Sequence, residues 1–358
     1  MYAEREVDFI IVGQGLAGSI LAHELLQRGR RVFVYDEPNK NYSSVVAAGL
    51  FNPITGRVMT KTWKADLLFP FLIDFYVKAE KRLGDRFYYP MPLYRPFINI
   101  HEQNGWMGKS AEPGMQSYID RILVSSEFGK QVHDDFGGLL LAQCGYVDTN
   151  LFIHSVRKSL LIQESYSSEH FIENELIITQ DFIQYERVKA KKIIFCNGYK
   201  SMGSQFFGWL PFKPLKGETV HIKVDQELEC IYNRGVYIVP SGNAGLYKVG
   251  ATYNTRDLAE SVTPEGRKEL SDKLSELIKL PFEITTQNWG IRPSTADRRP
   301  FLGSLPEEKK IVIFNGLGTK GVSLAPYFAN QLANWLLGEG ELDKEVDISR
   351  CKFKKIGP

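Results

Sequence analysis

The first forty residues combine two hydrophobic periods. Residues 9–12 form a continuous apolar, β-branched run, and residues 19–27 place apolar side chains at helical intervals. In residues 31–35 an arginine is followed by valines that alternate with aromatic residues. These periods predict a strand, a helix and a second strand. A strand, a helix and a strand in this order are typical of a βαβ unit, in which the two strands run parallel.

Both periods recur along the rest of the chain. The predicted later helices lie at residues 63–83, after Asp148, after Thr263-Pro264 and after Gly321. The predicted later strands lie at residues 193–196, 215–224, 236–252 and 311–314. Residues 86–140 are crowded with aromatic residues and prolines, and they predict strands and loops.

A glycine-rich turn joins the first predicted strand to its helix. Residues 13–18 have the G-x-G-x-x-G spacing, which allows a tight turn, backbone approach to a pyrophosphate and close packing of helix on strand. Asp36 ends the second strand, where a carboxylate can accept hydrogen bonds from an adenosine ribose. The unit therefore predicts an adenine dinucleotide, either FAD or NAD. The candidate contacts are Gly13, Gly15, Leu16, Ala17, Gly18, Asp36 and Glu37.

Two further glycine turns follow predicted strands far along the chain. Asn197-Gly198 ends the run at residues 193–196, and a turn containing Gly316, Gly318, Thr319, Lys320 and Gly321 ends the run at residues 311–314. A strand that ends in small residues lets backbone approach a ligand. Residues 45–56, which include Ala47, Ala48 and Gly49, are also small, as a backbone beside a flat ligand requires.

The three strand–glycine patterns predict one nucleotide-binding lobe that is discontinuous in sequence. At 358 residues the chain exceeds one average domain, so two lobes are expected. We assign residues 1–85, 141–212 and 285–358 to a Rossmann-like α/β domain. Residues 86–140 and 213–284 are assigned to a mainly antiparallel, α+β substrate domain.

Composition and charge narrow the possible partners. The net charge of +2 supplies no basic stripe for nucleic acid, and no apolar stretch approaches the ~20 residues of a membrane span. The first residues are charged and unlike a signal peptide. The four cysteines form no C-x-x-C pair and the six histidines have no metal-ligand spacing. We therefore expect reduced thiols, no metal site and a cytoplasmic location.

Two later motifs are more specific than the glycines. Residues 288–303 read N-W-G-I-R-P-S-T-A-D-R-R-P-F-L-G, and residues 316–321 read G-L-G-T-K-G before the last predicted helix. Residues 237–240 read Y-I-V-P and residues 215–218 read L-K-G-E. With these four segments, the chain resembles over most of its length the FAD-dependent oxidoreductases of the D-amino-acid oxidase and glycine oxidase type. The resemblance implies FAD, with its ring system near residues 47–49 and its pyrimidine edge at residues 318–321. Because no cysteine falls in residues 288–303 or 315–321, we expect the FAD to be non-covalent.

The resemblance also implies an activity. Arg292 matches the family arginine that holds a substrate carboxylate, and a guanidinium can grip a carboxylate through two hydrogen bonds. Tyr237 matches the tyrosine of the substrate sheet, although a strand tyrosine can equally pack in a core, and Tyr232 is a weaker candidate. The implied reaction oxidises the C–N bond of an amino acid or secondary amine bearing a carboxylate, by hydride transfer to flavin N5. Oxygen or another acceptor would reoxidise the flavin.

Other functions stay open at this point. Residues 292–303 and 316–326 are also similar to the oxidoreductase half of the bifunctional tRNA wobble-uridine modification enzyme, which oxidises a carboxymethylaminomethyl group. The near-neutral charge and the absence of a methyltransferase half count against that function. A flavin-binding protein without turnover is a third possibility, whereas an NAD-dependent dehydrogenase leaves the last glycine turn unexplained. The sequence leaves the substrate, the electron acceptor and the oligomeric state open.

Overall fold

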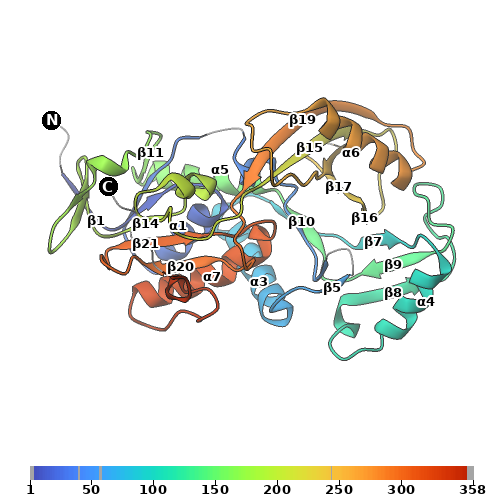
Figure 1. Cartoon of the computed structure of the whole chain (residues 1–358), viewed down its shortest axis with the longest axis horizontal. Coiled ribbons are helices and arrows are strands. Elements are labelled where there is room, and N and C mark those ends of the chain that lie inside the picture. Colours follow the sequence, from blue (N-terminus) through green and yellow to red (C-terminus); the bar gives the residue numbers. More distant parts are fainter. Residues whose placement is uncertain (1–3, 39–40, 56–58, 243, 353–358) are drawn as a thin grey trace.

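Two eight-stranded sheets occupy the two halves of the molecule in the computed structural model (Figure 1). The structure describes residues 4–38, 41–55, 59–242 and 244–352. Residue 56, which ends the small-residue segment expected at 45–56, lies outside these ranges. Between the two large sheets lie a three-stranded sheet and a two-stranded ladder.

The first sheet has the strand order β11-β2-β1-β14-β13-β12, and β21 pairs with both β14 and β20. Its strands are β1 (Arg5–Val12), β2 (Val32–Tyr35), β11 (Tyr166–Ser167), β12 (Ile177–Ile178), β13 (Ile183–Tyr185), β14 (Val188–Phe195), β20 (Phe301–Ser304) and β21 (Ile311–Asn315). The central strands β2, β1, β14 and β21 run parallel. They are buried over most of their length, which explains their continuous apolar runs.

Four helices belong to this half of the molecule. They are α1 (Leu16–Gln27), α3 (Ala65–Leu83), α5 (Thr149–Ile162) and α7 (Gly321–Leu336). Helix α1 packs against α5 and α7, and α3 packs against α7. The apolar sides of these helices form one large core with β1, β2 and β21. The βαβ unit predicted at the start of the chain is confirmed by the parallel pairing of β1 and β2.

The second sheet has the strand order β19-β15-β18-β17-β16-β7-β9-β8. Its strands are β7 (Leu93–Pro96), β8 (Ile119–Leu123), β9 (Gly138–Leu141), β15 (Leu215–Lys223), β16 (Ile231–Arg234), β17 (Val236–Pro240), β18 (Leu246–Gly250) and β19 (Glu283–Arg292). Most neighbours are antiparallel, as predicted for this part of the chain. Helix α6 (Pro264–Leu277) covers one face, and the Thr263 hydroxyl caps it by accepting from the N–H of Gly266.

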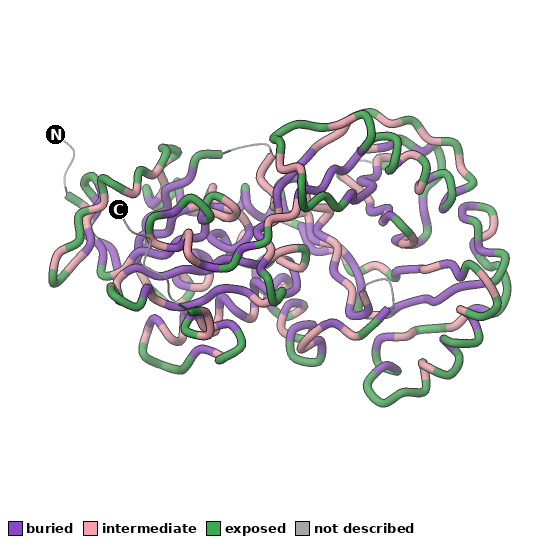
Figure 2. Tube along the Cα trace, in the orientation of Figure 1, coloured by how far each residue is buried: buried purple, intermediate pink, exposed green. Residues whose placement is uncertain are grey.

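Shorter elements lie in the segments between these helices and strands. They are α2 (Ser43–Val46), β3 (Leu50–Phe51), β4 (Ile54–Thr55), β5 (Thr60–Lys61), β6 (Tyr88–Pro90), β10 (Gly145–Val147) and the 3₁₀ turns η1 (Gln116–Tyr118), η2 (Glu173–Glu175), η3 (Gly198–Gly203) and η4 (Ile348–Arg350). Figure 2 shows buried strands in the interior of both halves, with the exposed positions gathered in the connecting loops and on the outer helices.

The structure differs from the sequence-based expectation at two places. Helix α4 (Ile100–Lys109) lies in the segment expected to hold strands and loops. The Asn99 side chain accepts from the N–H of Glu102, an N-cap signal that the surrounding aromatic residues obscured. Strand β19 pairs with β15 from Glu283 to Arg292, so residues 283–292 join the second sheet. We therefore propose that the boundary expected at residue 285 falls after Arg292.

Candidate active site

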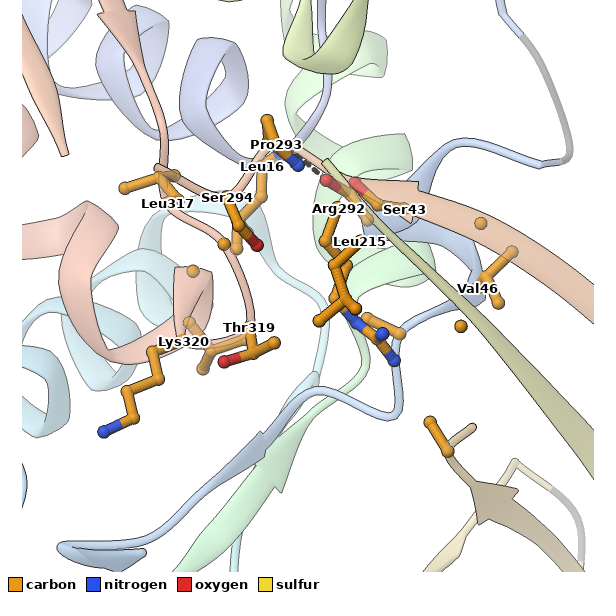
Figure 3. A pocket seen from close by; sticks show the side chains of 18 of the residues that line it. Leu16, Ser43, Val46, Leu215, Arg292, Pro293, Ser294, Leu317, Thr319 and Lys320 are labelled. Atoms are coloured by element: carbon orange, nitrogen blue, oxygen red, sulfur yellow. Dashed lines mark hydrogen bonds between the residues drawn. The ribbon is translucent and has the colours of Figure 1, made fainter. Parts of the chain in front are cut away.

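A cavity of about 2090 Å³ lies where the two large sheets meet. All three glycine turns line it, together with residues 46–50 and the ends of several strands of the second sheet. Because β1, β14 and β21 run parallel, the turns that follow them lie at one edge of the first sheet. This is the edge at which open α/β sheets bind ligands. Figure 3 looks into the cavity, with Leu317, Thr319 and Lys320 on one side and Arg292 on the other.

The first glycine turn leaves no room for side chains at two positions. A Cβ atom on Gly13 would lie 2.8 Å from the Cα of Asn197, and a Cβ atom on Gly18 would lie 1.9 Å from the carbonyl oxygen of Gly13. Gly13 also has a φ of +95°. The start of α1 is therefore held close to β1 and β14, with its positive dipole end at the cavity. This bare backbone fits a pyrophosphate.

Two carboxylates follow β2 at the cavity wall. Asp36 is buried and accepts from the N–H of Gln14 at 2.8 Å, and its Oδ2 lies 3.4 Å from Arg157. Burial raises the pKa of the Asp36 carboxyl above its ordinary value. Glu37 is exposed, and its contacts with His170 at 2.9 Å and Lys200 at 3.1 Å lower its pKa. Each carboxylate keeps acceptor sites for a ribose hydroxyl.

The loop after α2 is tied to both halves of the molecule. A Cβ atom on Gly49 would lie 1.8 Å from the carbonyl oxygen of Val147, so only glycine fits there. Lys248, on β18, donates from Nζ to the carbonyl oxygen of Ala47 at 2.9 Å. Lys248 is 8% exposed, and burial lowers its pKa to about 8. Ala47 and Ala48 thus present backbone and small side chains to the cavity, as expected beside a flat ligand.

The last glycine turn is fixed to the turn after β14. Asn315 donates from Nδ2 to the carbonyl oxygen of Gly198 at 2.8 Å. Lys320 lies directly before α7, and its Nζ donates to Thr55 at 3.0 Å and Thr62 at 3.3 Å. Its side chain points away from Arg292 in Figure 3. Burial, with the nearby charges of Arg298 and Arg299, lowers the pKa of Lys320.

Arg292 ends β19 and enters the cavity from the second sheet. Its guanidinium lies over Gly217, where a Cβ atom would be 2.2 Å from Nη1. Tyr253 lies on its other side, with the guanidinium carbon 5.2 Å from the ring centroid. Nη1 is buried and has no hydrogen-bond partner within the described ranges. Arg292 therefore has donor capacity for an anion that enters the cavity.

Tyr237 and Thr219 lie beside Arg292 on the same face of the second sheet. A Cβ atom on Gly250 would be 2.5 Å from the Tyr237 hydroxyl oxygen and 2.9 Å from Cγ2 of Thr219, so both side chains meet over this glycine. Burial raises the pKa of Tyr237 to about 12. Thr219 Oγ1 is buried and unpaired in the part of the chain that the structure describes. Arg292, Tyr237 and Thr219 thus form a polar corner of the cavity.

The structure does not bring Tyr232 to this corner. Tyr232 is fully buried on the opposite face of the sheet, where its hydroxyl donates to Gln131 Oε1 at 2.6 Å. It packs there beside Tyr94 and Phe128. The register explains the difference, because Tyr237 pairs with Asn233, the residue after Tyr232. Adjacent residues of a strand face opposite ways.

Thr219 and Lys248 were missed by the sequence reasoning. Nothing in their immediate sequence distinguishes them from ordinary strand residues. The signal is the strand register, because Thr219 pairs with Gly250, and Gly250 pairs with Tyr237. Within the described residues, no group of three or more His, Cys, Asp or Glu side chains is arranged to hold a metal ion.

The comparison with protein families identifies the family of this chain. The family model described as FAD dependent oxidoreductase matches residues 8–335. The chain belongs to this family. The members depend on FAD, and the glycine turns, the carboxylates after β2 and the small-residue loop of this FAD-dependent oxidoreductase fit that cofactor.

Individual relatives share the family at low identity. The chain is 23% identical to glycine oxidase of Bacillus subtilis over 351 residues, which cover 90% of this chain and 91% of the relative. It is also 23% identical to the tRNA 5-methylaminomethyl-2-thiouridine biosynthesis bifunctional protein MnmC of Marinobacter nauticus, over 91% of this chain and 54% of that protein. The chain thus spans about half the length of the bifunctional relatives it matches.

Solved structures share the fold of this FAD-dependent oxidoreductase. Glycine oxidase from Geobacillus kaustophilus has a TM-score of 0.77 and 18% identity, over 99% of this chain and 100% of that chain. Iminodiacetate oxidase from Chelativorans has a TM-score of 0.77 and 19% identity, over 96% of this chain and 98% of that chain. Among the described residues, no helix has the length and apolar character needed to span a membrane.

Proposed function

We propose that this flavoenzyme oxidises the C–N bond of an amino acid or secondary amine that carries a carboxylate. The observation that carries the proposal is the buried Nη1 of Arg292, which has no hydrogen-bond partner among the described residues and lies at a cavity that fits FAD. Glycine oxidases and iminodiacetate oxidase, whose named substrates are such compounds, support it.

The polar corner would bind and orient the substrate. Arg292 would hold the carboxylate with two hydrogen bonds. The Tyr237 and Thr219 hydroxyls would donate hydrogen bonds to the same carboxylate or to polar atoms beside the amine. Fixing the carboxylate fixes the direction of the reacting C–H bond, which is the main contribution that a protein makes to such a reaction. A neutral substrate amine is required, and the net positive charge of the corner disfavours the ammonium form.

When bound, FAD would serve as the acceptor of two electrons and the C–H hydrogen, and the amine would lose its N–H proton as the C–N bond becomes C=N. Water then adds to the released imine, which gives an oxo acid and ammonia, or an aldehyde and an amine. Oxygen or another electron acceptor would then reoxidise the reduced flavin.

The proposal is tested by anaerobic flavin bleaching with glycine, sarcosine, proline and D- and L-amino acids. We expect a subset of them to bleach the wild-type protein. Arg292→Ala should keep its FAD and lose apparent substrate affinity by about 30-fold or more, because the loss of one partner of a buried charge pair costs roughly 2 kcal/mol or more. Arg256→Ala, at an exposed position outside the cavity, is the matched control and should behave as wild type.

Two results would contradict the proposal. Unchanged substrate affinity in Arg292→Ala would remove Arg292 from the binding site. A protein that keeps tightly bound FAD and bleaches with none of these compounds would instead favour a flavin-binding role without turnover.

A second candidate function is oxidation of a tRNA wobble-uridine side chain. The observation in its favour is the match of 91% of this chain to the MnmC protein of Marinobacter nauticus. Binding of tRNA would depend steeply on salt, because phosphate contacts release counterions. Filter retention of tRNA at 50 and 200 mM salt tests this function, and the absence of retention at low salt would remove it.

A further inference from the structure

The far end of the cavity carries positive charge that the side chains of the described residues do not balance. Arg95 on β7 and Arg234 at the end of β16 line it there. Both guanidinium groups share the carboxylate of Glu102 on α4, which lies 2.9 Å from Arg234 Nη1 and 3.8 Å from Arg95 Nη2. The two guanidinium cations and the one carboxylate together carry a net charge of +1.

Arg95 is the more sheltered of the two cations. Its side chain is 13% exposed, and its Nε is buried without a hydrogen-bond partner among the described residues. Burial and the Arg234 charge lower the pKa of the Arg95 guanidinium, which nevertheless stays protonated. A sheltered cation that is incompletely paired is unfavourable, and an anion that reaches it from the cavity would relieve that cost.

The other charges at this end are open to solvent. Helix α6 contributes Lys273, Glu269 and Glu276 to the cavity wall. Lys273 and Glu269 pair with each other at 2.5 Å, and both are substantially exposed. Glu276 is also exposed. Solvent and salt screen these groups, so they offset little of the charge on Arg95.

Strand register places Arg95 in line with the polar corner. Tyr237 pairs with Asn233, and β16 pairs with β7 through Ile231 with Leu93 and Tyr232 with Tyr94. The next position in that register sets Asn233 beside Arg95. Two strand spacings therefore separate Tyr237 from Arg95, or about 10 Å between their Cα atoms.

The side chains lengthen this separation. The Tyr237 hydroxyl reaches back over Gly250, whereas the Arg95 guanidinium reaches toward Glu102. A ligand that touches both ends is thus at least as long as about three extended residues.

We propose that Arg95 and Arg234 form a distal anion subsite for the far end of an elongated amine substrate. The subsite takes a carboxylate or phosphate group, while the substrate's own α-carboxylate lies at Arg292. The inference rests on the proposed amine oxidation and adds a substrate class to it, namely amines with two anionic ends.

Chain-length kinetics test the subsite. The probes are N-alkylglycines, N-(ω-carboxyalkyl)glycines and the matching ω-phosphates, with two to ten methylene groups. We expect kcat/KM to favour the anionic chains over the neutral ones by about tenfold or more once the chain spans roughly eight bonds, since charge-assisted hydrogen bonds have that strength. Short chains should show no such preference. The carboxylate and phosphate series then identify which anion is preferred.

Three variants locate the effect. Arg95→Met should abolish the preference for long anionic chains and leave short N-alkylglycines unaffected. Glu102→Gln removes the shared negative charge and should increase the preference for long anionic chains. A folding defect cannot produce such an increase, so this variant checks that the loss in Arg95→Met comes from the missing charge. Arg121→Met is the control, because Arg121 lies near the same end of the sheet on β8 and is exposed, outside the cavity. FAD content and the melting temperature are measured for each.

The outcomes separate this inference from the proposed function. If neither the N-alkylglycines nor the amino acids of the bleaching test are oxidised, the proposed function fails. If the amino acids are oxidised and no N-alkylglycine is, the proposed function holds and the subsite is overturned. If short chains are oxidised but long anionic chains gain nothing, or gain equally in Arg95→Met, the subsite is overturned. Salt-dependent retention of tRNA that Arg95→Met abolishes, without any preference among the small anions, would also overturn it in favour of an RNA phosphate contact.

Discussion

At the scale of single residues, the polar corner combines one residue that the sequence indicates and one that it does not. Arg292 lies in a recognisable motif, and the structure places it at the cavity. Thr219 has no motif, and it becomes a candidate only because its strand pairs with Gly250 and Asn288. Tyr232 and Tyr237 look alike in sequence, and only their opposite faces on the sheet distinguish them.

Thr219 provides a prediction with opposite effects on stability and binding. Its hydroxyl is buried and has no partner among the residues that the structure describes, so Thr219→Val should leave stability unchanged or raise it by up to about 1 kcal/mol. If substrate satisfies the hydroxyl, the same variant should bind substrate about 3- to 10-fold more weakly, and Thr219→Ser should retain wild-type affinity. Urea unfolding and the substrate dependence of flavin bleaching measure the two effects. Equal affinity in all three proteins would show that substrate does not use this hydroxyl.

At the scale of elements, local patterns predicted the glycine turns, the helices α1, α3, α5, α6 and α7 and several of the longer strands, whereas pairing partners required the structure. Nothing in the sequence of strand β19 indicates that it pairs with β15 in the second sheet. Helix α4 was missed because a short helix with few buried residues has a weak apolar period. The contact between β18 and the loop after α2 joins elements two hundred residues apart, and local sequence carries no information about it.

The Lys248 contact predicts a specific pH dependence of stability. Its pKa falls from 10.5 to about 8 on folding, so between these values the unfolded chain binds more protons than the folded one. Stability should therefore rise as the pH increases from about 8 to 10, by roughly 3 kcal/mol from this group when complete. Lys248→Met should lose this rise, which urea unfolding at pH 7.5 and 10 measures.

The same variant should also weaken FAD binding, because it frees the Ala47 carbonyl from its anchor. Fluorescence titration of the apoprotein with FAD measures this, with His221→Gln as a control on the neighbouring strand. A wild-type pH dependence retained in Lys248→Met would assign the titration to another group.

At the scale of the whole molecule, the family fold requires segments from the beginning, middle and end of the chain to meet. The sequence indicated this through three strand–glycine patterns, and the parallel pairing of β1, β14 and β21 confirms that they share one sheet edge. The depth of the cavity and its extension to Arg95 were not predictable, since they depend on how the two sheets face each other. A cofactor that contacts all three turns should stabilise the lobe as a unit.

This linkage gives a prediction for the intact protein. FAD at about 100 times its Kd should stabilise the folded chain by roughly 2.7 kcal/mol, visible as a higher Tm. Gly18→Ala should abolish the shift, because its Cβ would overlap the Gly13 carbonyl. Gly108→Ala in α4 meets no atom within 4 Å and should keep the full shift. A normal FAD-dependent shift in Gly18→Ala would show that the turn tolerates the added atom and that its close packing does not set FAD binding.

The hydrogen bond made by the residue that follows β19 affects how the sequence of such an enzyme can change during evolution. Arg292 is the last residue of the second sheet, and the next residue is bonded to the other half of the molecule, because the Pro293 carbonyl accepts from the N–H of Gly318 at 3.2 Å. The proposed anchor for the reacting end of the substrate is thereby fastened to the glycine turn itself. Insertions and substitutions around β7, β8 and α4 can accumulate without moving it. New substrate preferences can therefore evolve at the distal end while the chemistry is inherited unchanged.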